Sequence, residues 1–328
     1  MPDLRAGLIG LGMMGRHHAR VLGALPGVEL VAVADPGGDV HGAAAGRPVH
    51  EDIHQLIAAG IDYCMVAVPT AYHEEVGLAL AEAGVHAIIE KPLAPDTPAA
   101  EKLANAFATR GLVGAVGHIE RYNPALQQAR ARLEAGDLGE VHQVATRRQG
   151  PFPARIADVG VVKDLGTHDI DLTAWVTQQS FVTVAARTAY KSGREHEDLV
   201  AVVGQLSNGT VTNHLVNWLS PLKERVTIIT GERGTLVADT LTADLTYYAN
   251  GEVATTWDDI ANFRGVSEGD VVRYAIPKPE PLRVEHEQFR NAVLGEDADI
   301  VTLEQGLATV RVAEACIQSA ATGQTITV

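Results

Sequence analysis

The sequence has few cysteines and no long apolar run. Its two cysteines, Cys64 and Cys316, stand far apart in apolar surroundings, which is neither a disulfide framework nor a metal-ligand spacing. We expect both to be buried thiols. No apolar stretch approaches the roughly 18 residues of a membrane span. Asp3, Arg5 and repeated glycines stand near the start of the chain, where a secretory signal is continuously apolar. We therefore expect a cytoplasmic protein.

Positive charge is also scarce. The 328 residues include 26 Lys and Arg against 41 Asp and Glu, a formal net charge of −15. That sign opposes binding to nucleic acid or to an anionic membrane surface, so neither partner is expected. With 46% hydrophobic and 20% charged residues, the composition is that of a folded globular protein. At roughly 150 residues per domain, the length predicts two domains.

Up to residue 118, short apolar runs alternate with helical patterns. The predicted strands are 4–9, 28–34, 61–68, 85–89 and 112–116, and the predicted helices are 13–25, 52–59, 72–83 and 97–109. The strand runs are apolar on both faces, as in a parallel sheet covered by helices on both sides. Residues 1–118 are therefore predicted to form an α/β Rossmann domain that binds a dinucleotide.

From residue 119 the pattern changes to consecutive strands. The predicted strands are 141–148, 181–190, 199–206, 210–218, 225–230, 235–239 and 245–249, and the predicted helices are 124–136, 163–176, 283–294 and 303–321. Turn pairs such as Asn208-Gly209 and Asn250-Gly251 are typical of hairpins. Residues 119–328 are therefore predicted to form an α+β domain with a large, mainly antiparallel open sheet.

A glycine pattern follows the first predicted strand and opens the first helix. Its members are Gly10, Gly12, Met13, Met14 and Gly15. The first glycine permits a tight turn, the second lets the backbone approach a pyrophosphate, and the third lets the helix pack on the strand. The phosphates would lie at the partly positive helix start. The next two residues of note, His17 and His18, are expected on a helix face without a chemical role.

Asp35 ends the second predicted strand, twenty residues after Gly15. A carboxylate at that distance accepts hydrogen bonds from the adenosine ribose hydroxyls. It would also repel a 2′-phosphate, and Pro36-Gly37-Gly38 provides no arginine to neutralise one. The sequence therefore predicts NAD, rather than NADP, as the cofactor.

Two further strand ends carry candidate residues. Pro69 and Thr70 follow the third strand of the parallel series and are predicted to line the cofactor crevice, as is His73, for which a solvated position in the first turn of a helix is an equal alternative. Glu90-Lys91-Pro92 ends the next strand, where an ammonium can stabilise a developing alkoxide. Glu90 and Lys91 are expected beside the cofactor, although such a pair also occurs on solvated surfaces.

The second domain supplies Asp164, His168 and Asp171 at helical spacings of four and three, which predicts one stripe. A histidine oriented by a carboxylate accepts a proton near neutral pH. Solvated polar residues on a helix surface are the alternative. Trp175, further along the stripe, is expected in the core.

These motifs together resemble one family. GLGMMG, EKP, GHIERYNPA at residues 117–125 and DLGTHDID at residues 164–171 resemble the Gfo/Idh/MocA oxidoreductases over nearly the whole length. VGHIERYNPA and the segment around Arg147 to Asp171 further resemble the nucleotide-sugar branch that includes UDP-N-acetylglucosamine 3-dehydrogenase. The resemblance implies a tightly held nicotinamide cofactor, a second domain whose open sheet makes subunit contacts in a homodimer or homotetramer, and oxidation of a sugar or cyclitol hydroxyl.

The resemblance also implies roles for individual residues. Lys91 and His168 become the catalytic pair, with Asp164 as their companion. The implied substrate-binding residues are His118, Arg121, Tyr122, Asn123, Arg155, Asp164 and His168. An imidazole from the second domain must then face an amine from the first across the dinucleotide.

Four arginines, Arg121, Arg147, Arg148 and Arg155, flank this region in an otherwise acidic chain. Guanidinium groups suit a diphosphate. Arg147 and Arg148 are neighbours on a strand and point to opposite faces, so at most one is expected in the cleft. Arginines that guard a strand edge are the alternative.

We therefore expect NAD-dependent oxidation of a ring hydroxyl, foremost of a nucleotide sugar such as UDP-N-acetylglucosamine at C3. The alternatives are a dehydrogenase of a free sugar, an inositol or an antibiotic-pathway sugar, and a protein of the same fold that senses NAD without catalysis.

Overall fold

The computed structural model describes residues 3–153, 159–251 and 267–328. Contacts divide the chain into two units, Met1–Ile119 with Glu280–Glu314, and Glu120–Pro279 with Ala315–Val328. The predicted boundary after residue 118 lies one residue from the first division. The predicted second domain differs from the structure because Glu280–Glu314 return to the first unit.

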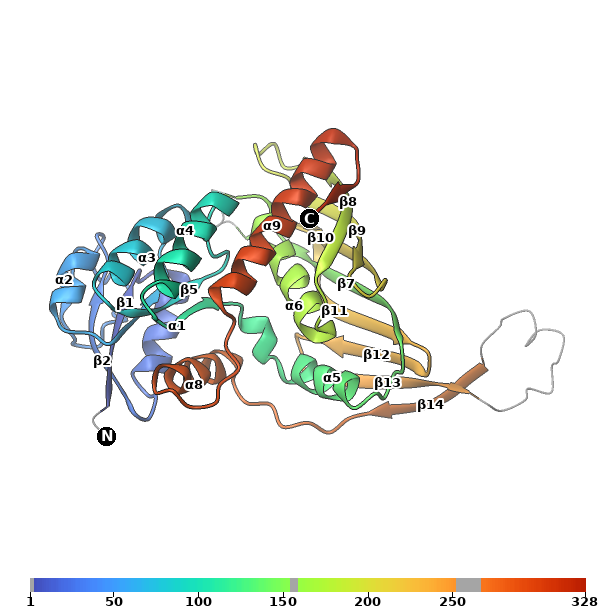
Figure 1. Cartoon of the computed structure of the whole chain (residues 1–328), viewed down its shortest axis with the longest axis horizontal. Helices are drawn as coiled ribbons and strands as arrows, with labels where there is room; N and C mark the ends of the chain where they lie inside the picture. Colours follow the sequence, from blue (N-terminus) through green and yellow to red (C-terminus); the bar gives the residue numbers. More distant parts are fainter. Residues whose placement is uncertain (1–2, 154–158, 252–266) are drawn as a thin grey trace. The chain divides into compact units, whose positions relative to one another are not determined.

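The first unit is built on a six-stranded parallel sheet (Figure 1) with the order β3-β2-β1-β4-β5-β6. The strands are β1 (Leu4–Ile9), β2 (Val28–Ala34), β3 (Val49–His50), β4 (Tyr63–Val66), β5 (His86–Glu90) and β6 (Gly114–Gly117). The order reverses between β1 and β4, the place where ligands bind in open sheets of this type.

Helices cover both faces of this sheet. They are α1 (Met13–Leu22), α2 (Ile53–Ala58), α3 (His73–Glu82), α4 (Thr97–Ala108), α8 (Pro281–Val293) and α9 (Leu303–Thr322). One apolar cluster joins the sheet to α2, α3, α4 and the first part of α9, and another joins it to α1 and α8. Asp52 and Asp96 cap α2 and α4 by accepting the amide protons of Gln55 and Ala99, which satisfies donors that a helix start leaves open.

Two contacts explain why the chain returns to the first unit. Phe289 of α8 is fully buried and packs edge-on against Tyr63 of β4, with ring centroids 5.4 Å apart. The amide of Val116 in β6 donates to the carbonyl of Val301 at 2.9 Å. These apolar and main-chain contacts link segments about 200 residues apart in sequence, and no local pattern reveals them.

The second unit contains a nine-stranded sheet with the order β14-β13-β12-β11-β7-β10-β9-β8-β15. The strands are β7 (Val141–Pro151), β8 (Phe181–Ala189), β9 (Leu199–Leu206), β10 (Val211–Asn217), β11 (Leu219–Gly231), β12 (Gly234–Asp239), β13 (Asp244–Gly251), β14 (Ser267–Arg273) and β15 (Ile326–Thr327). Only the β7–β10 pair among the described strand pairs of this sheet is parallel. The large, mainly antiparallel sheet that the sequence predicts is confirmed.

Two helices, α5 (Pro124–Glu134) and α6 (Thr167–Thr177), pack on one face of this sheet (Figure 1). Leu126 of α5 and Trp175 of α6 are buried against strand residues such as Val144 and Leu236, so the expected core position of Trp175 is confirmed. Cys64 and Cys316 are buried free thiols, as expected. No helix in the described ranges is long and apolar enough to cross a membrane.

Candidate active site

The loop between β1 and α1 contains three glycines, and a side chain at each of them would meet different surroundings. Gly10 has φ +92°, and a Cβ there would lie 2.5 Å from the carbonyl oxygen of Ala67. A Cβ on Gly15 would lie 1.8 Å from the carbonyl oxygen of Gly10. A Cβ on Gly12 would meet no described atom within 4 Å. The chain itself therefore requires Gly10 and Gly15, whereas Gly12 leaves open space beside the helix start.

That space suits a pyrophosphate. Gly12 is the N-cap of α1, and no side chain in the described part of the structure caps the helix there. The first amides of α1, from Met13 and Met14 onward, therefore have no capping acceptor and are available to an anion. Met13 is 46% exposed and Gly12 is exposed.

Asp35, directly after β2, is fixed against this loop. Its Oδ2 accepts the amide proton of Leu11 at 2.7 Å, and its Oδ1 accepts the amide proton of Gly37 at 2.8 Å. Each carboxylate oxygen has a second lone pair that can accept from a ribose hydroxyl. The glycine loop and Asp35 thus fit the two ends of the adenosine diphosphate half of NAD.

The residues after β4 divide into exposed and buried positions. Pro69 is exposed and Thr70 is half-buried, as a crevice lining requires. His73 is instead 1% exposed, with Nε2 3.0 Å from the carbonyl oxygen of Val68 and Nδ1 3.0 Å from that of Pro92. Burial lowers the pKa of His73, against smaller effects of these carbonyls and of Glu90. Both ring nitrogens already contact the main chain, so the ring links two strand-end segments instead of lying in solvent.

The segment after β5 carries Lys91, which is half-buried and precedes a cis peptide bond to Pro92. Glu90 is 8% exposed, and its Oε2 accepts the amide proton of Lys91 at 3.0 Å. Its Oε1 lies 2.9 Å from Nε2 of His18. Glu90 was predicted to contact the cofactor, but both carboxylate oxygens face groups of the protein.

Lys91 and His118 lie at the ends of neighbouring strands. Glu90 of β5 pairs with Gly117 of β6, so Lys91 and His118 each directly follow the last paired residue of neighbouring strands. His118 is 1% exposed, and its amide donates to the carbonyl of Val116 at 2.8 Å. The carboxyl ends of parallel strands share one edge of a sheet, so this edge carries the glycine loop, Asp35, Lys91 and His118.

In the second unit, Arg121 is buried and forms a two-point ion pair with Asp171. Its Nε donates to Oδ2 at 2.8 Å, and one terminal nitrogen donates to Oδ1 at 2.6 Å. Both carboxylate oxygens of Asp171 therefore accept from Arg121. Tyr122 is buried at 4% exposure. Asn123 uses both side-chain atoms, accepting from Ala125 and donating to the carbonyl of Thr240, each at 3.0 Å.

Arg148 is also internal. Its Nε donates to Asp169 at 2.9 Å, and a terminal nitrogen donates to Glu120 at 3.0 Å. Burial acts to raise the pKa of Glu120, but Arg148 and Arg225 outweigh it and hold that pKa below its ordinary value. Arg147 faces the other side, is largely exposed and lies 3.5 Å from Glu224. The opposite orientation of Arg147 and Arg148 is confirmed, and Arg155 lies outside the described residues.

The segment that carries Asp164 and His168 is not one regular α-helix. A π-helical turn, Val162–Gly166, precedes α6, so the predicted stripe with 3.6-residue spacing is interrupted at Asp164. Asp164 and His168 are 5% and 9% exposed. π-Helical turns occur often at functional sites because they displace side chains from the regular helical register.

Sequence reasoning missed a cluster of buried titratable residues in the first unit. His18, expected on a helix face, is completely buried, and its Nδ1 lies 2.8 Å from Nε2 of His286 on α8. Glu285, beside His286, is 1% exposed. A signal existed, because His286 and Glu285 occupy the apolar stripe of α8 that Leu282 and Phe289 define.

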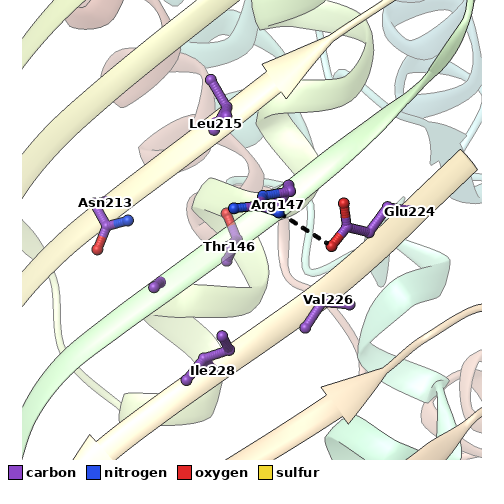
Figure 2. A pocket seen from close by; sticks show the side chains of 8 residues that line it. Thr146, Arg147, Asn213, Leu215, Glu224, Val226 and Ile228 are labelled. Carbon is purple, nitrogen blue, oxygen red and sulfur yellow. Dashed lines mark ion pairs between the residues drawn. The ribbon is translucent and has the colours of Figure 1, made fainter. Parts of the chain in front are cut away.

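A shallow pocket lies elsewhere, on the face of the nine-stranded sheet that bears Arg147 and Glu224 (Figure 2). Leu215 of β10, Arg147 of β7 and Val226 of β11 are direct neighbours across the sheet, and their side chains line it. Of the four candidate arginines, Arg147 lines this pocket, and the residues predicted to bind the cofactor or to act in catalysis are not among its lining residues.

A doubly wound sheet with a glycine loop and a carboxylate after the second strand, followed by an α+β unit, is the architecture expected of a nicotinamide-dependent oxidoreductase. Two models of the Gfo/Idh/MocA oxidoreductase family match the chain, the NAD-binding Rossmann fold at residues 4–118 and the C-terminal alpha/beta domain at residues 130–328. The chain belongs to this family, and its first domain is an NAD-binding domain.

Several relatives are dehydrogenases. UDP-N-acetylglucosamine 3-dehydrogenase of Acidithiobacillus ferrooxidans is 34% identical over 216 residues, which is 65% of this chain and 66% of that protein, just under two thirds of each. The solved structure of that enzyme, named GnnA, has a TM-score of 0.84 at 28% identity and covers 98% of this chain and 99% of its own.

Two other relatives align over nearly the whole chain. Inositol 2-dehydrogenase 2 of Saccharopolyspora erythraea is 29% identical over 98% of this chain and 94% of its own length. The structure of GenD2 from gentamicin A biosynthesis, solved in complex with NAD, has a TM-score of 0.82 at 26% identity and covers 100% of this chain and 97% of its own.

Proposed function

We propose that this oxidoreductase removes a hydride from a ring hydroxyl carbon of a nucleotide sugar, foremost C3 of UDP-N-acetylglucosamine. The observation that carries the proposal is the shared strand-end edge of the first unit, where Lys91 and His118 follow the last paired residues of β5 and β6 on the edge that also bears Asp35 and the glycine loop. The similarity to UDP-N-acetylglucosamine 3-dehydrogenase supports the choice of substrate.

The proposed reaction converts an alcohol and NAD⁺ to a ketone, NADH and a proton. NAD⁺, when bound, supplies the hydride acceptor. His168 accepts the hydroxyl proton, and Asp164 is the carboxylate that accompanies it beside the substrate. The Lys91 ammonium donates a hydrogen bond to the same oxygen as negative charge develops on it.

The diphosphate of such a substrate requires cationic donors. Arg148 is engaged by Asp169 and Glu120, and two donor nitrogens of Arg121 are engaged by Asp171. Arg147 lies beside Glu224 on the opposite face of the sheet from Arg148. We therefore assign the diphosphate to Arg155, the fourth arginine considered above, with Arg121 as an internal support for the segment that holds Tyr122 and Asn123.

A cyclitol substrate is the second candidate. Internal ion pairs occupy two of the predicted diphosphate ligands, and a substrate without phosphate does not need them. The inositol 2-dehydrogenase relative also aligns over 98% of this chain. A binding protein that senses NAD without turnover is the candidate outside enzymology.

Initial rates of NADH formation separate these candidates. UDP-N-acetylglucosamine, N-acetylglucosamine and myo-inositol are compared at 340 nm with NAD⁺, and we expect the highest kcat/KM for the nucleotide sugar. Lys91→Ala and His168→Ala should each lower turnover about a hundredfold, the scale of a lost acid–base contribution, with NADH affinity retained. A preference for myo-inositol selects the second candidate. Near-wild-type turnover in both variants rejects the catalytic roles.

We further propose that two copies associate through the face of the nine-stranded sheet that holds the pocket (Figure 2). Val203, Val211 and Ile228 are 55%, 45% and 37% exposed there, and exposed apolar patches mark protein–protein contacts. Arg147 and Glu224 lie on the same face, so a two-fold contact at this face allows each arginine to meet the partner copy's glutamate. Ile228→Asp should reduce the mass measured by light scattering. Leu241→Asp, an exposed turn control, should leave it unchanged, and equal masses for all forms reject this interface.

A further inference from the structure

A series of hydrogen-bonded, buried side chains, His286, His18 and Glu90, ends at the main-chain amide of Lys91. Nε2 of His286 lies 2.8 Å from Nδ1 of His18, and Nε2 of His18 lies 2.9 Å from Oε1 of Glu90. The other oxygen of Glu90 accepts the amide proton of Lys91 at 3.0 Å. His18 and His286 are both 0% exposed. Three elements of the first unit, α1, α8 and β5, thus meet behind the proposed catalytic lysine.

The charge states of these groups decide which atom donates and which accepts in each contact of the series. Burial acts to raise the pKa of Glu90, but the His18 hydrogen bond and the Lys91 charge outweigh it, and the pKa stays below its ordinary value. Burial lowers the pKa of His286 well below its ordinary value. An ionised Glu90 only accepts, so Nε2 of His18 donates to it. When His18 is neutral, its Nδ1 accepts, and His286 donates.

The Lys91 segment is also held from its other side. Nδ1 of His73 lies 3.0 Å from the carbonyl oxygen of Pro92, and its Nε2 lies 3.0 Å from the carbonyl oxygen of Val68. Main-chain groups on both sides of Lys91 therefore contact buried side chains. The Lys91 main chain cannot shift without breaking a buried hydrogen bond, which is costly.

We propose that Glu90, supported by His18 and His286, is a positioning residue that fixes the Lys91 main chain and so aims the ammonium at the substrate oxygen. The inference rests on the proposed function of Lys91. It assigns Glu90 a role different from the cofactor contact that its position in the sequence predicts. A misplacement of about 1 Å at a reacting group is enough to lower turnover by up to a hundredfold.

A double-mutant cycle tests this role. Glu90→Ala removes the acceptor for the Lys91 amide, and Glu90→Gln keeps one acceptor oxygen in nearly the same place. Both are made alone and together with Lys91→Ala, and kcat, KM for the sugar, NADH affinity by fluorescence and thermal unfolding are measured. Glu287→Ala is the matched control. Glu287 lies on α8 and pairs with Arg283 near the surface, and it is not a member of the buried His286–His18–Glu90 series.

We expect Glu90→Ala to lower kcat by about tenfold to a hundredfold, with NADH affinity within about twofold of the wild type. Glu90→Gln should recover most of the loss, and Glu287→Ala should have no effect. In the Lys91→Ala background, Glu90→Ala should cause no further loss, because residues that act as a unit are not additive.

Other results overturn the proposal. An equal loss of kcat in both backgrounds indicates a general structural effect, and a loss confined to NADH affinity indicates a cofactor contact. If Glu90→Ala does not fold, the same cycle with His18→Asn decides between the same outcomes. If Lys91→Ala alone leaves kcat unchanged, the proposed function of Lys91 is rejected, independently of the result for the Glu90 variants. The failure of the proposed function is therefore distinguishable from the failure of this inference.

Discussion

Replacement of Glu285 by glutamine should change how the stability of the protein depends on pH. Glu285 is 1% exposed, and neither carboxyl oxygen has a hydrogen-bond partner among the described residues. Burial, and secondarily the charge of Glu90, raise the pKa of Glu285 well above its ordinary value of 4.5. The folded protein therefore holds this group as a neutral acid at pH values where the unfolded chain has released the proton.

The sign and size of the effect follow from this difference. Below about pH 4.5 the group is protonated in both states, and it adds no pH dependence. Above that, the unfolded chain binds fewer protons, so the free energy of unfolding falls as pH rises, by about 1.4 kcal/mol per pH unit until the folded group ionises. The loss accumulates over the pH range in which the folded group is still protonated and the unfolded group has ionised.

Glutamine cannot ionise, so Glu285→Gln should remove this slope. Thermal or urea unfolding of wild type and variant is measured at pH 5, 6 and 7. The free energy of unfolding of the variant, relative to that of the wild type, should increase as pH rises. A buried amide without a partner shifts the whole curve equally at every pH, so only the change in slope is tested. Glu287→Gln on the exposed side of α8 should leave the slope unchanged. Parallel curves for wild type and Glu285→Gln would refute the reasoning.

Three further predictions concern the dinucleotide site. Asp35→Ala should weaken NAD⁺ binding and relax discrimination against NADP⁺, measured as the ratio of their kcat/KM values; an unchanged ratio counts against the ribose contact. Gly12→Val should fold normally but weaken NADH binding at least tenfold by fluorescence titration, because its side chain enters the open space at the start of α1; normal affinity would place the pyrophosphate elsewhere. Gly15→Ala should lower the unfolding temperature, because its Cβ would meet the carbonyl oxygen of Gly10, and an unchanged temperature contradicts that packing.

The sequence predicted the first domain well because its signals are local. Apolar runs bounded by turns mark β1 and β2 at the bounds that the structure gives, as they also do for β9 of the second unit. The glycine pattern predicted the loop before α1 because the spacing of its glycines is itself a local sequence signal. The short strands β3 and β15 have two residues each, and β14 reads SEGDVVR, so these edge strands carry too little apolar periodicity to be recognised.

Long-range pairing limited the prediction of the site. The ion pair of Arg121 with Asp171 joins residues 50 positions apart, and that of Arg148 with Asp169 joins residues 21 apart. Composition and spacing suggested arginines for a substrate, and only the fold shows that carboxylates of the protein engage two of them. The buried His18–His286 contact spans 268 positions. The sequence signal for this contact is that α1 and α8 each carry polar residues on their apolar faces.

The most direct test of the account is a crystal structure of the protein with NAD⁺ and UDP-N-acetylglucosamine bound. We expect the Lys91 ammonium and the His168 imidazole within hydrogen-bond distance of one sugar hydroxyl, with the hydrogen on that carbon directed at the nicotinamide. A complex in which His168 or Lys91 contacts neither the sugar nor the nicotinamide would contradict the proposed catalysis.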